Sequence, residues 1–536
     1  MDTNIDQLLD KGITHHKATQ FNEAEACYQQ VLGEQKSNVE ALHLLGLLRY
    51  QSGSYDSALQ LIKEAINLKS DYPDALNNLG LVYEAKNLPD LAQEQYEQAL
   101  LLNRESEQAL CNLGGLYLAN YQLQRARSLF ERALKLNPKS VEVLSNLGKV
   151  AHDEGDLKKA YDLYIKALEV SPNYPLALNN LGQLYLDQGD VEKAFIFIDR
   201  SLTYDADFTE AIVNKALVLL RLGVFKEGWA NYESRVKRTY HRDYLLDPRN
   251  PKVELPRPST YCPIELDSKQ LVVLSEQGLG DELFFLRFAQ TVKAKGGRIR
   301  YRSSKKLFSV LSRVECLESV FVGPSEIGQP DLIASVCELP LLTQMGAVDD
   351  IPAPLTLTPD EFVMDKIASK LEQFPRPWIG VSWKAGTPYS QYSLYKEAPL
   401  NLLINLMKGV RATWIIMQRE PDKRELYNIV EDVGRDKVVD FSFINNDLEE
   451  ALATTALLDD YVAVSNTNLH FRASVDKPAR VLIPVKSEFR WMVDGETSPW
   501  FPTFELYRQN DKSGWEDAFN RLEKDLAIRY ANQFNT

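Results

Sequence analysis

The sequence predicts a multidomain protein in which an all-α superhelix of repeats, over residues 1–238, precedes an α/β region. Small residues recur every 34 positions in the first part, which indicates a repeated helical unit. From residue 269 short apolar runs alternate with helical patterns, and this alternation is typical of parallel sheets with helices on both faces. The alternation restarts after a pair of prolines, so we expect two similar halves, 269–375 and 376–536.

The repeats are defined by one small residue in each period. Glycine or alanine occupies this position throughout: Gly12, Gly46, Gly80, Gly114, Gly148, Gly182 and Ala216. A second small residue follows twelve positions later, for example Ala92 after Gly80. Small side chains at both positions let the two helices of one unit pack closely. A helix-turn-helix unit of this length resembles the tetratricopeptide repeat, whose stacked units form an extended binding surface.

Asparagine recurs with the same period inside the first helix of five units. The positions are Asn78, Asn112, Asn146, Asn180 and Asn214. Asparagine is a mediocre helix former, so its recurrence needs a cause. A carboxamide offers both a donor and an acceptor, and a row of them on the concave face can clamp an extended polypeptide whatever its side chains. The alternative is that asparagine is only a frequent residue of such repeats.

A proline-rich linker is expected at 239–268, where five prolines stand between 248 and 263. Beyond it, the predicted strands are 271–274, 298–301, 319–322, 332–335, 378–382, 413–417, 438–441, 461–464 and 480–483. The predicted helices are 284–295, 400–409, 447–457 and 512–530. Two Rossmann-like halves follow from this order, with a ligand in the crevice at the carboxyl ends of the strands.

The composition of the chain limits the classes of molecule that it can bind. The net charge of −14 argues against nucleic acid or an anionic membrane surface. We expect a cytoplasmic protein, because the N-terminus lacks the features of a signal peptide and no run of about 18 apolar residues is present. The five cysteines have no paired spacing and suggest reduced thiols. No cluster of His, Cys and carboxylates suggests a metal, so neither metal nor cofactor is expected.

The sharpest candidate loop follows the first predicted strand. Gly278 and Gly280 permit a tight turn and a close approach of the backbone, and the helix start after them can face an anion. Asp281 then stands at the crevice, where it can act as the general base that deprotonates an acceptor hydroxyl. The alternative for Asp281 is a plain helix N-cap.

Two loops of the second half are donor-site candidates. Lys384 follows the strand 378–382 and suits a leaving phosphate, although it can equally be a solvated lysine. A polar helix start, whose free N–H groups can hold a phosphate, comes after the strand 461–464. It consists of Ser465, Asn466, Thr467 and Asn468. His470, in the first turn, either stabilises leaving-group charge or only packs. An aromatic loop at 489–502 lines a sugar or base pocket or, more simply, packs in a core.

These loops resemble those of glycosyltransferases. Glu276-Gln-Gly-Leu-Gly-Asp-Glu, Ser382-Trp-Lys-Ala-Gly, Ser465-Asn-Thr-Asn-Leu-His and Ser498-Pro-Trp-Phe-Pro are similar to motifs of the two-Rossmann (GT-B) enzymes, above all the heptosyltransferase-like group. The resemblance covers about 269–530. It implies metal-independent transfer from a nucleotide-sugar, with Asp281 as the base. The group usually has Asp where this chain has Asn466, which leaves the nature of the donor open.

The whole chain is similar to bacterial proteins that join such repeats to a transferase. Some of these are flagellin glycosyltransferases that move a nonulosonic acid from a CMP donor to Ser or Thr, and the layout also resembles that of O-GlcNAc transferases. The resemblance therefore implies a protein O-glycosyltransferase that holds its acceptor, expected to be flagellin, on the repeats. Two alternatives stay open: a saccharide or lipopolysaccharide transferase whose repeats recruit a partner, and a non-catalytic scaffold.

Overall fold

The computed structural model describes residues 2–237, 265–323, 326–328, 330–386, 396–510 and 513–531. Its contacts divide the chain into two compact units, Met1–Asn180 and Leu181–Thr536, and each is described by itself. Most of the predicted linker, including Cys262, lies outside the described residues. The four cysteines that are described are buried free thiols.

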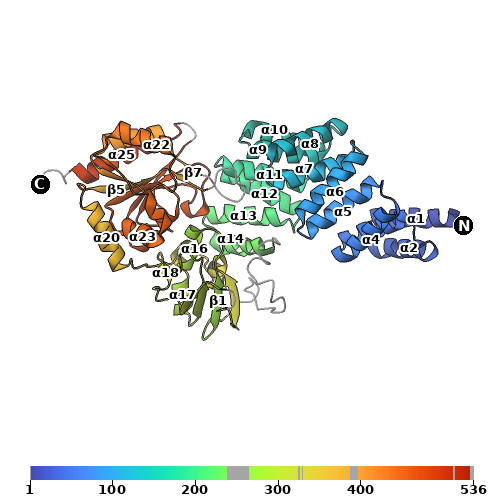
Figure 1. Cartoon of the computed structure of the whole chain (residues 1–536), viewed down its shortest axis with the longest axis horizontal. Coiled ribbons are helices and arrows are strands. Elements are labelled where there is room, and N and C mark those ends of the chain that lie inside the picture. Colours follow the sequence, from blue (N-terminus) through green and yellow to red (C-terminus); the bar gives the residue numbers. More distant parts are fainter. Residues whose placement is uncertain are drawn as a thin grey trace. The chain divides into compact units, whose positions relative to one another are not determined.

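The repeat region is built from paired antiparallel helices, coloured blue to green in Figure 1. The first unit holds α1 Asp2–Lys17, α2 Phe21–Glu34, α3 Val39–Gln51, α4 Tyr55–Leu68, α5 Pro73–Ala85, α6 Pro89–Leu102, α7 Glu107–Ala119, α8 Leu123–Leu136, α9 Val141–Asp153, α10 Leu157–Val170 and the start of α11 Pro175–Asp187. The second unit continues with α12 Val191–Tyr204, α13 Thr209–Arg221, α14 Phe225–Tyr232 and the 3₁₀ helix η1 Glu233–Lys237. The predicted helical repeats are confirmed.

The periodic glycines explain the close packing within each pair. A methyl group on Gly114 would lie 2.7 Å from the ring of Phe130, which projects from the second helix of the same unit. Ala126, twelve positions after Gly114, is fully buried. The last repeat exchanges the two residue types, and there a methyl group on Gly228 would lie 2.7 Å from Leu220. The small residues are therefore required by contact between the paired helices.

The first α/β half contains a four-stranded parallel sheet in the order β3-β2-β1-β4. Its elements are β1 Gln270–Leu274, α16 Leu279–Leu286, α17 Ala289–Ala294, β2 Arg298–Arg302, α18 Phe308–Leu311, β3 Ser319–Phe321, β4 Leu332–Ser335, η3 Val336–Glu338, α19 Leu339–Leu342 and η4 Val348–Asp350. The helix predicted at 284–295 begins earlier and is interrupted. Arg287 Nε donates to the Phe284 carbonyl, so the N–H of Phe288 turns to Phe285 instead, which breaks the α-helical pattern.

The second half contains a six-stranded parallel sheet in the order β12-β11-β10-β5-β8-β9. Its strands are β5 Trp378–Ser382, β8 Thr413–Ile416, β9 Val438–Asp440, β10 Asp460–Val464, β11 Ala479–Ile483 and β12 Phe504–Arg508, and a small hairpin joins β6 Lys384–Ala385 to β7 Lys396–Glu397. Numbered along the chain, the order is that of a doubly wound Rossmann sheet. The predicted parallel sheets are confirmed, and β12 is a strand that we did not predict.

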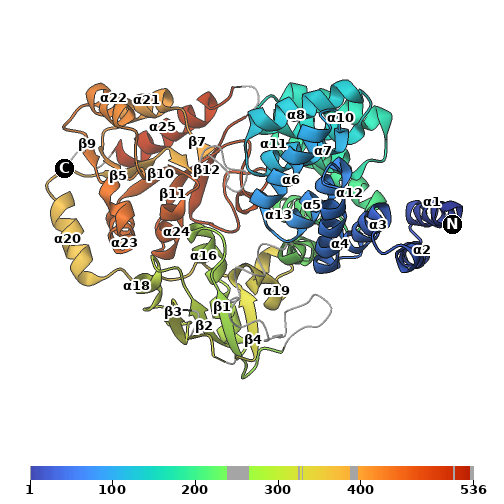
Figure 2. The same cartoon turned by 45° about the vertical axis from the view of Figure 1, so that its right-hand side comes forward.

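Helices cover both faces of this second sheet, as Figure 2 shows. They are α20 Glu361–Leu371, α21 Leu400–Gly409, α22 Lys423–Val433, α23 Leu448–Leu457, α24 Thr467–Ser474 and α25 Glu516–Tyr530, with the short 3₁₀ helices η5 Ser442–Asn446 and η6 Phe489–Trp491. Along β10, Val462 and Val464 pack with α21, α22 and α25, whereas Tyr461 and Ala463 pack with α23 and α24. The alternation of side chains in a strand produces these two separate cores.

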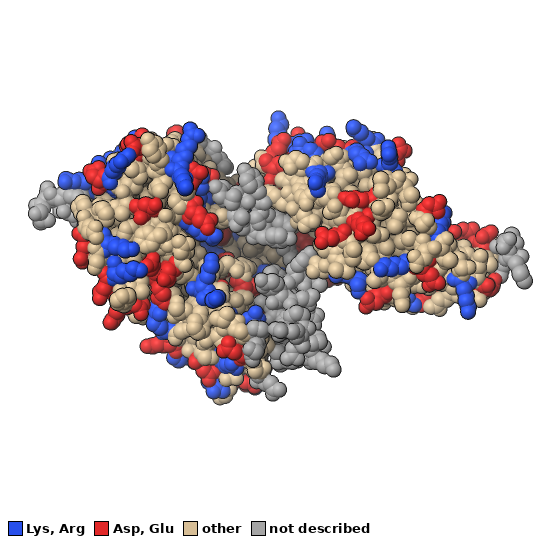
Figure 3. Space-filling model, viewed as in Figure 1, with Lys and Arg blue, Asp and Glu red and all other residues tan. Residues whose placement is uncertain are grey.

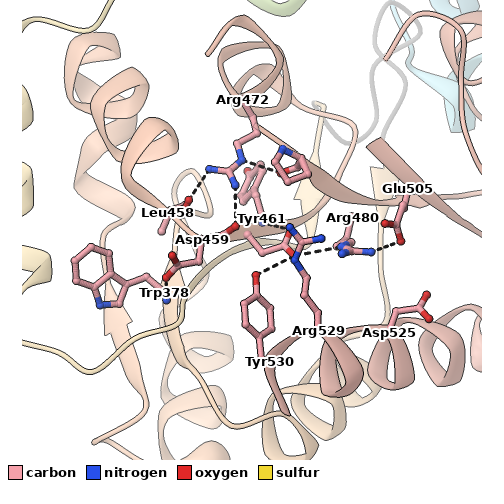
Figure 4. A network of polar contacts seen from close by, with 12 residues as sticks. Trp378, Leu458, Asp459, Tyr461, Arg472, Arg480, Glu505, Asp525, Arg529 and Tyr530 are labelled. Atoms are coloured by element: carbon pink, nitrogen blue, oxygen red, sulfur yellow. Dashed lines mark hydrogen bonds and ion pairs between the residues drawn. The ribbon is translucent and has the colours of Figure 1, made fainter. Parts of the chain in front are cut away.

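A buried polar network fastens helices to the start of β10 (Figure 4). Asp460 accepts hydrogen bonds from Arg480 Nε at 3.2 Å and from the Tyr530 hydroxyl, on α25, at 3.3 Å. Arg472, on α24, donates to the carbonyls of Leu458 and Asp459. Because these groups lie at the amino end of the strand, they stabilise the sheet at the edge opposite to the expected ligand crevice.

An aromatic cluster attaches the last repeat helix to the α/β region. Trp229, on α14, lies edge-on to Phe285, Phe489 and Trp500, with ring centroids 5.6–6.2 Å apart. Trp500 and Trp491 are almost completely buried, as the packing interpretation of the aromatic loop predicts. The loop 489–502 therefore belongs to the core that joins α14 to both sheets.

Candidate functional site

The candidate site forms where two helices begin at the carboxyl edges of the two sheets. α16 follows β1 and α24 follows β10, and each of these strands stands where the strand order of its sheet reverses. Ligands of doubly wound sheets bind at such points. The two helices contact one another, and Figure 2 shows α24 beside α16. The structure thus brings the glycine loop and the polar helix start together.

Asp281 lies in the first turn of α16. Gly278 is the N-cap residue and no side chain caps the helix, so the N-cap interpretation of Asp281 is wrong. The Asp281 carboxylate instead forms an ion pair with Arg490. Gly280 permits the approach of α24, because a methyl group there would lie 3.1 Å from Cδ2 of His470.

Arg490 connects Asp281 with His470. Its Nη2 binds the Asp281 carboxylate, and its Nη1 lies 3.0 Å from Nε2 of His470. A guanidinium can only donate, so His470 accepts at Nε2 and carries its proton on Nδ1. Burial, with the positive charges of Arg490, Arg287 and Lys396, holds the pKa of His470 well below its usual range. His470 is therefore neutral, and the positive charge beside Asp281 belongs to Arg490.

The polar helix start has the predicted position, and much of it is used for internal bonds. Asn466 caps α24 by accepting from the N–H of Leu469 at 3.1 Å, and it donates to the Tyr461 hydroxyl at 3.0 Å. Asn468 lies 3.5 Å from Asn445. Thr467 is the first helical residue, and its Cα is 3.7 Å from the position of a methyl group on Gly280.

Glu488 is a further charged residue of the cluster. Ser465 donates to it at 3.0 Å, Lys396 at 2.6 Å and the indole of Trp491 at 3.1 Å. Burial raises the pKa of Glu488, but the charges of Lys396 and Arg490 outweigh burial and lower the pKa to about 2. Glu488 is therefore a carboxylate that fixes Ser465 and Lys396 at the end of β10.

Lys384 does not belong to the cluster around Arg490. Its ammonium binds Glu425, on α22, and Glu397, on the facing strand β7. Burial lowers the pKa of Lys384, but the two carboxylates outweigh burial and raise the pKa above its usual range. Among the contacts of the described residues, Lys384 has none with Asp281 or Arg490. The lysine of this hairpin that reaches the cluster is Lys396.

Sequence reasoning missed Arg490, Lys396 and Glu488. Arg490 and Glu488 stand in a stretch that we interpreted only through its aromatic residues. A basic residue between two aromatics, Phe489 and Trp491, is the local signal that could have drawn attention to Arg490. Lys396 offers no such signal, because only the β6–β7 pairing brings it to the end of β10.

The asparagine ladder is partly used within the repeats. Asn78 donates to Nε2 of His43 at 2.7 Å, Asn112 to Oδ1 of Asn77 at 2.9 Å, and Asn180 approaches the hydroxyl of Ser145 at 3.5 Å. Each acceptor belongs to the preceding repeat. Asn146 and Asn214, like Asn78 and Asn112, are partly buried. The carboxamides of Asn78, Asn112 and Asn180 therefore connect successive repeats.

The chain carries a net charge of −14, but one face of the molecule is mixed in sign. Acidic and basic side chains are interspersed on the face of the molecule drawn in Figure 3. Within the described ranges, no three His, Cys or carboxylate side chains are grouped as a metal site. None of the described helices has the length and apolar character needed to cross a membrane.

Comparison with known proteins supports the repeats directly. Residues 46–87 match a family model described as TPR repeat, and residues 77–141 and 140–206 match models described as tetratricopeptide repeat. A curated relative, Protein FlbA of Caulobacter vibrioides, is 23% identical over 341 residues, which cover 58% of this chain and 54% of FlbA. The chain thus spans about half the length of this relative. The aligned part is 58% of this chain, which is a larger share than residues 1–238 represent. The similarity to FlbA therefore extends beyond the repeats.

Solved structures that are similar to this chain include tetratricopeptide repeat proteins. A tetratricopeptide repeat protein from Parabacteroides merdae is 18% identical, covering 45% of this chain and 96% of that one, with a TM-score of 0.38. TTC0263 from Thermus thermophilus is 24% identical, covering 34% and 99%, with a TM-score of 0.32. YrrB, described as a TPR protein with an unusual peptide-binding site, is 24% identical, covering 35% and 98%, with a TM-score of 0.28. From the family matches and the paired helices, residues 46–206 consist of tetratricopeptide repeats.

Proposed function

We propose that this protein is an O-glycosyltransferase of the GT-B type that modifies a protein held by its tetratricopeptide repeats. One observation carries the proposal. The carboxyl edges of two parallel sheets converge so that a carboxylate on the first helix start, Asp281, faces a buried cation, Arg490, beside the second helix start. Group transfer from an anionic leaving group requires a base for the acceptor and a cation for the leaving group, and Asp281 and Arg490 can supply the two.

The proposed reaction uses these groups as follows. The Asp281 carboxylate takes the proton of a Ser or Thr hydroxyl, and the oxygen forms a bond to the anomeric carbon of the sugar. The bond between that carbon and the phosphate oxygen breaks, and the nucleotide leaves with the electron pair. Asp281 has 27% of its side chain exposed, so a hydroxyl can reach it. The N–H groups at the start of α24, with Gly278 and Gly280 opposite, provide donors for the phosphate.

The identities of the acceptor and the donor are inferred from the resemblance alone. Flagellin as acceptor, a nonulosonic acid as the sugar and CMP as its carrier are properties of the bacterial proteins that this chain resembles, and a cytoplasmic reaction suits them. The similarity to Protein FlbA extends beyond the repeats, which supports treating the repeats and the α/β region as parts of one protein. The asparagine ladder supports an acceptor bound along the repeats, since carboxamides pair with any peptide backbone.

Intact-protein mass spectrometry tests the proposal. Host cells that produce the wild-type chain, Asp281→Asn or the control Asp365→Asn are compared, and flagellin and abundant cytosolic proteins are weighed. Asp365 is an exposed residue of α20. We expect one protein to lose a sugar-sized mass in Asp281→Asn only. A change confined to surface polysaccharide would favour the saccharide transferase, and no change at all would favour the scaffold.

A further inference from the structure

We infer that Arg490 is the cation that binds an anionic group of the donor, and that in the free protein the Asp281 carboxylate occupies this binding position. The inference rests on the proposed function and adds a ligand-binding residue and an order of events to it. It identifies the ligand by its chemistry, as a phosphate or as the carboxylate of an acidic sugar.

The cluster around Arg490 carries an excess of positive charge. Three cations act on His470: Arg490, Arg287 and Lys396. The carboxylates paired with them are Asp281, on Arg490, and Glu488, on Lys396. Arg287 donates to the carbonyls of Phe284 and Trp500, which supply no negative charge. A buried excess cation in a chain whose net charge is −14 is costly unless an anion joins it.

Arg490 is fixed by buried neighbours, so its position does not depend on the Asp281 carboxylate alone. Its guanidinium lies 4.5 Å from the ring centre of Phe284, and its Nη1 binds His470, which is itself buried. Arg490 has 7% of its side chain exposed and Asp281 has 27%, so the carboxylate is the accessible partner. Nε of Arg490 is buried and has no hydrogen-bond partner among the described residues. A guanidinium with an unused donor suits an incoming oxyanion with several oxygens.

The exchange has a consequence for the order of the reaction. While the Asp281 carboxylate accepts from the guanidinium of Arg490, it is not available to accept from the hydroxyl of an acceptor. When the donor's anion takes over Arg490, Asp281 is released and becomes able to accept the hydroxyl proton. The donor therefore binds before the acceptor is activated, and the proton is not removed in the absence of a sugar to transfer.

Nucleotide affinity measured by calorimetry tests the exchange. CMP, UDP and GDP are titrated into the full-length wild type, Asp281→Asn, Arg490→Gln and the double variant. We expect Asp281→Asn to bind one nucleotide about tenfold more tightly, because the competing carboxylate is gone. We expect Arg490→Gln to bind it at least about tenfold more weakly, and the double variant to match Arg490→Gln.

The double variant separates direct competition from a general charge effect. One outcome is that the double variant binds the nucleotide more tightly than Arg490→Gln by the same factor as Asp281→Asn does relative to the wild type. The Asp281 carboxylate then acts only by long-range repulsion of the anion, and the inference is wrong. If the wild type binds a nucleotide, but neither the nucleotides nor CMP-N-acetylneuraminate bind more tightly to Asp281→Asn, the inference is overturned and the proposed function stands. Binding by none of the four proteins overturns both. If Arg490→Gln does not fold, Arg490→Lys replaces it, with an intermediate loss of affinity expected.

A second titration distinguishes the two anion sources. CMP carries only a phosphate, whereas CMP-N-acetylneuraminate also carries the carboxylate of the sugar. If the gain in Asp281→Asn is seen with both ligands, Arg490 binds the phosphate. If it is seen only with the sugar nucleotide, Arg490 binds the sugar carboxylate. A gain with neither contradicts the inference.

Discussion

Arg235, in η1 at the end of the repeats, forms two parallel hydrogen bonds of 2.9 Å to the carboxylate of Glu276, in the loop after β1. Both side chains are buried, with exposed fractions of 7% and 4%. Ser335, at the end of β4, donates to the same carboxylate, and the Arg235 guanidinium lies 4.2 Å from the ring centre of Tyr232. The loop that leads from β1 to α16, the helix of Asp281, is therefore held between the last repeat and the first sheet.

Breaking this pair should destabilise the α/β region strongly. Glu276→Ala leaves the Arg235 guanidinium buried without its partner, and we expect a loss of about 3–5 kcal/mol in the free energy of unfolding. Replacing both residues, as Arg235→Met with Glu276→Leu, should restore most of this loss, because no buried charge then remains. Urea unfolding followed by circular dichroism measures both. The exposed Glu420 serves as a control, since Glu420→Ala should change stability by less than about 0.5 kcal/mol.

Two neighbouring glycines of α7 should respond to alanine with opposite signs. Gly114→Ala places a methyl group 2.7 Å from the Phe130 ring and should destabilise the repeats by about 1–3 kcal/mol. Gly115→Ala meets no atom within 4 Å and should stabilise them by about 0.5–1 kcal/mol, because alanine favours a helix. Thermal unfolding of the two variants provides the comparison. Equal shifts would contradict the packing role of the periodic glycine.

His43 should make the stability of the repeats depend on pH. Burial lowers the pKa of His43 to about 4, where its neutral ring accepts from Asn78 and contacts the Tyr72 hydroxyl. In the unfolded chain the ring titrates near 6.5, so between about pH 6.5 and 4 the unfolded state binds more protons. The free energy of unfolding should therefore decrease as the pH is lowered from 6.5 to 4, by at most roughly 3 kcal/mol.

A substitution isolates this contribution. Asn77, the equivalent residue of the next repeat, accepts from Asn112 without a titratable group. In His43→Asn the loss of stability between pH 6.5 and 4 should therefore be smaller than in the wild type, and the difference curve reports His43 alone. His15→Gln, in α1, is measured alongside as a second histidine substitution. Parallel curves for wild type and His43→Asn would show that the ring is not held neutral.

Replacing Asn146 should weaken the binding of the acceptor protein and leave the binding of the donor unchanged. Asn78, Asn112 and Asn180 bond to the preceding repeat, whereas no such bond involves Asn146 in the described residues. With flagellin as acceptor, Asn146→Ala should raise KM by about tenfold at unchanged kcat, since loss of uniform binding raises KM alone. Gln108→Ala, exposed on α7, is the control. A fall in kcat at constant KM would exclude a binding role for Asn146.

The sequence predicted the elements better than their ends. The strands β5 and β4 and the helix α21 have the expected bounds, because each is a compact apolar run between clear turn residues. The start of α16 was misplaced, since Gly278 and Gly280 indicated a loop although Gly280 is already helical. The strand β12 was missed because its residues follow an aromatic loop and look like its continuation.

By itself the sequence determined the repeats and the two sets of parallel strands, because both depend on periodicities within a few tens of residues. It also placed Asp281 and Ser465 in the segments that follow β1 and β10. Only the tertiary structure decided what surrounds them. Arg490 reaches Asp281 across 209 positions, and Lys396 meets Glu488 across 92. Local patterns encode the pitch of a helix or the alternation of a strand, whereas contacts between distant loops follow from how whole sheets and helices pack.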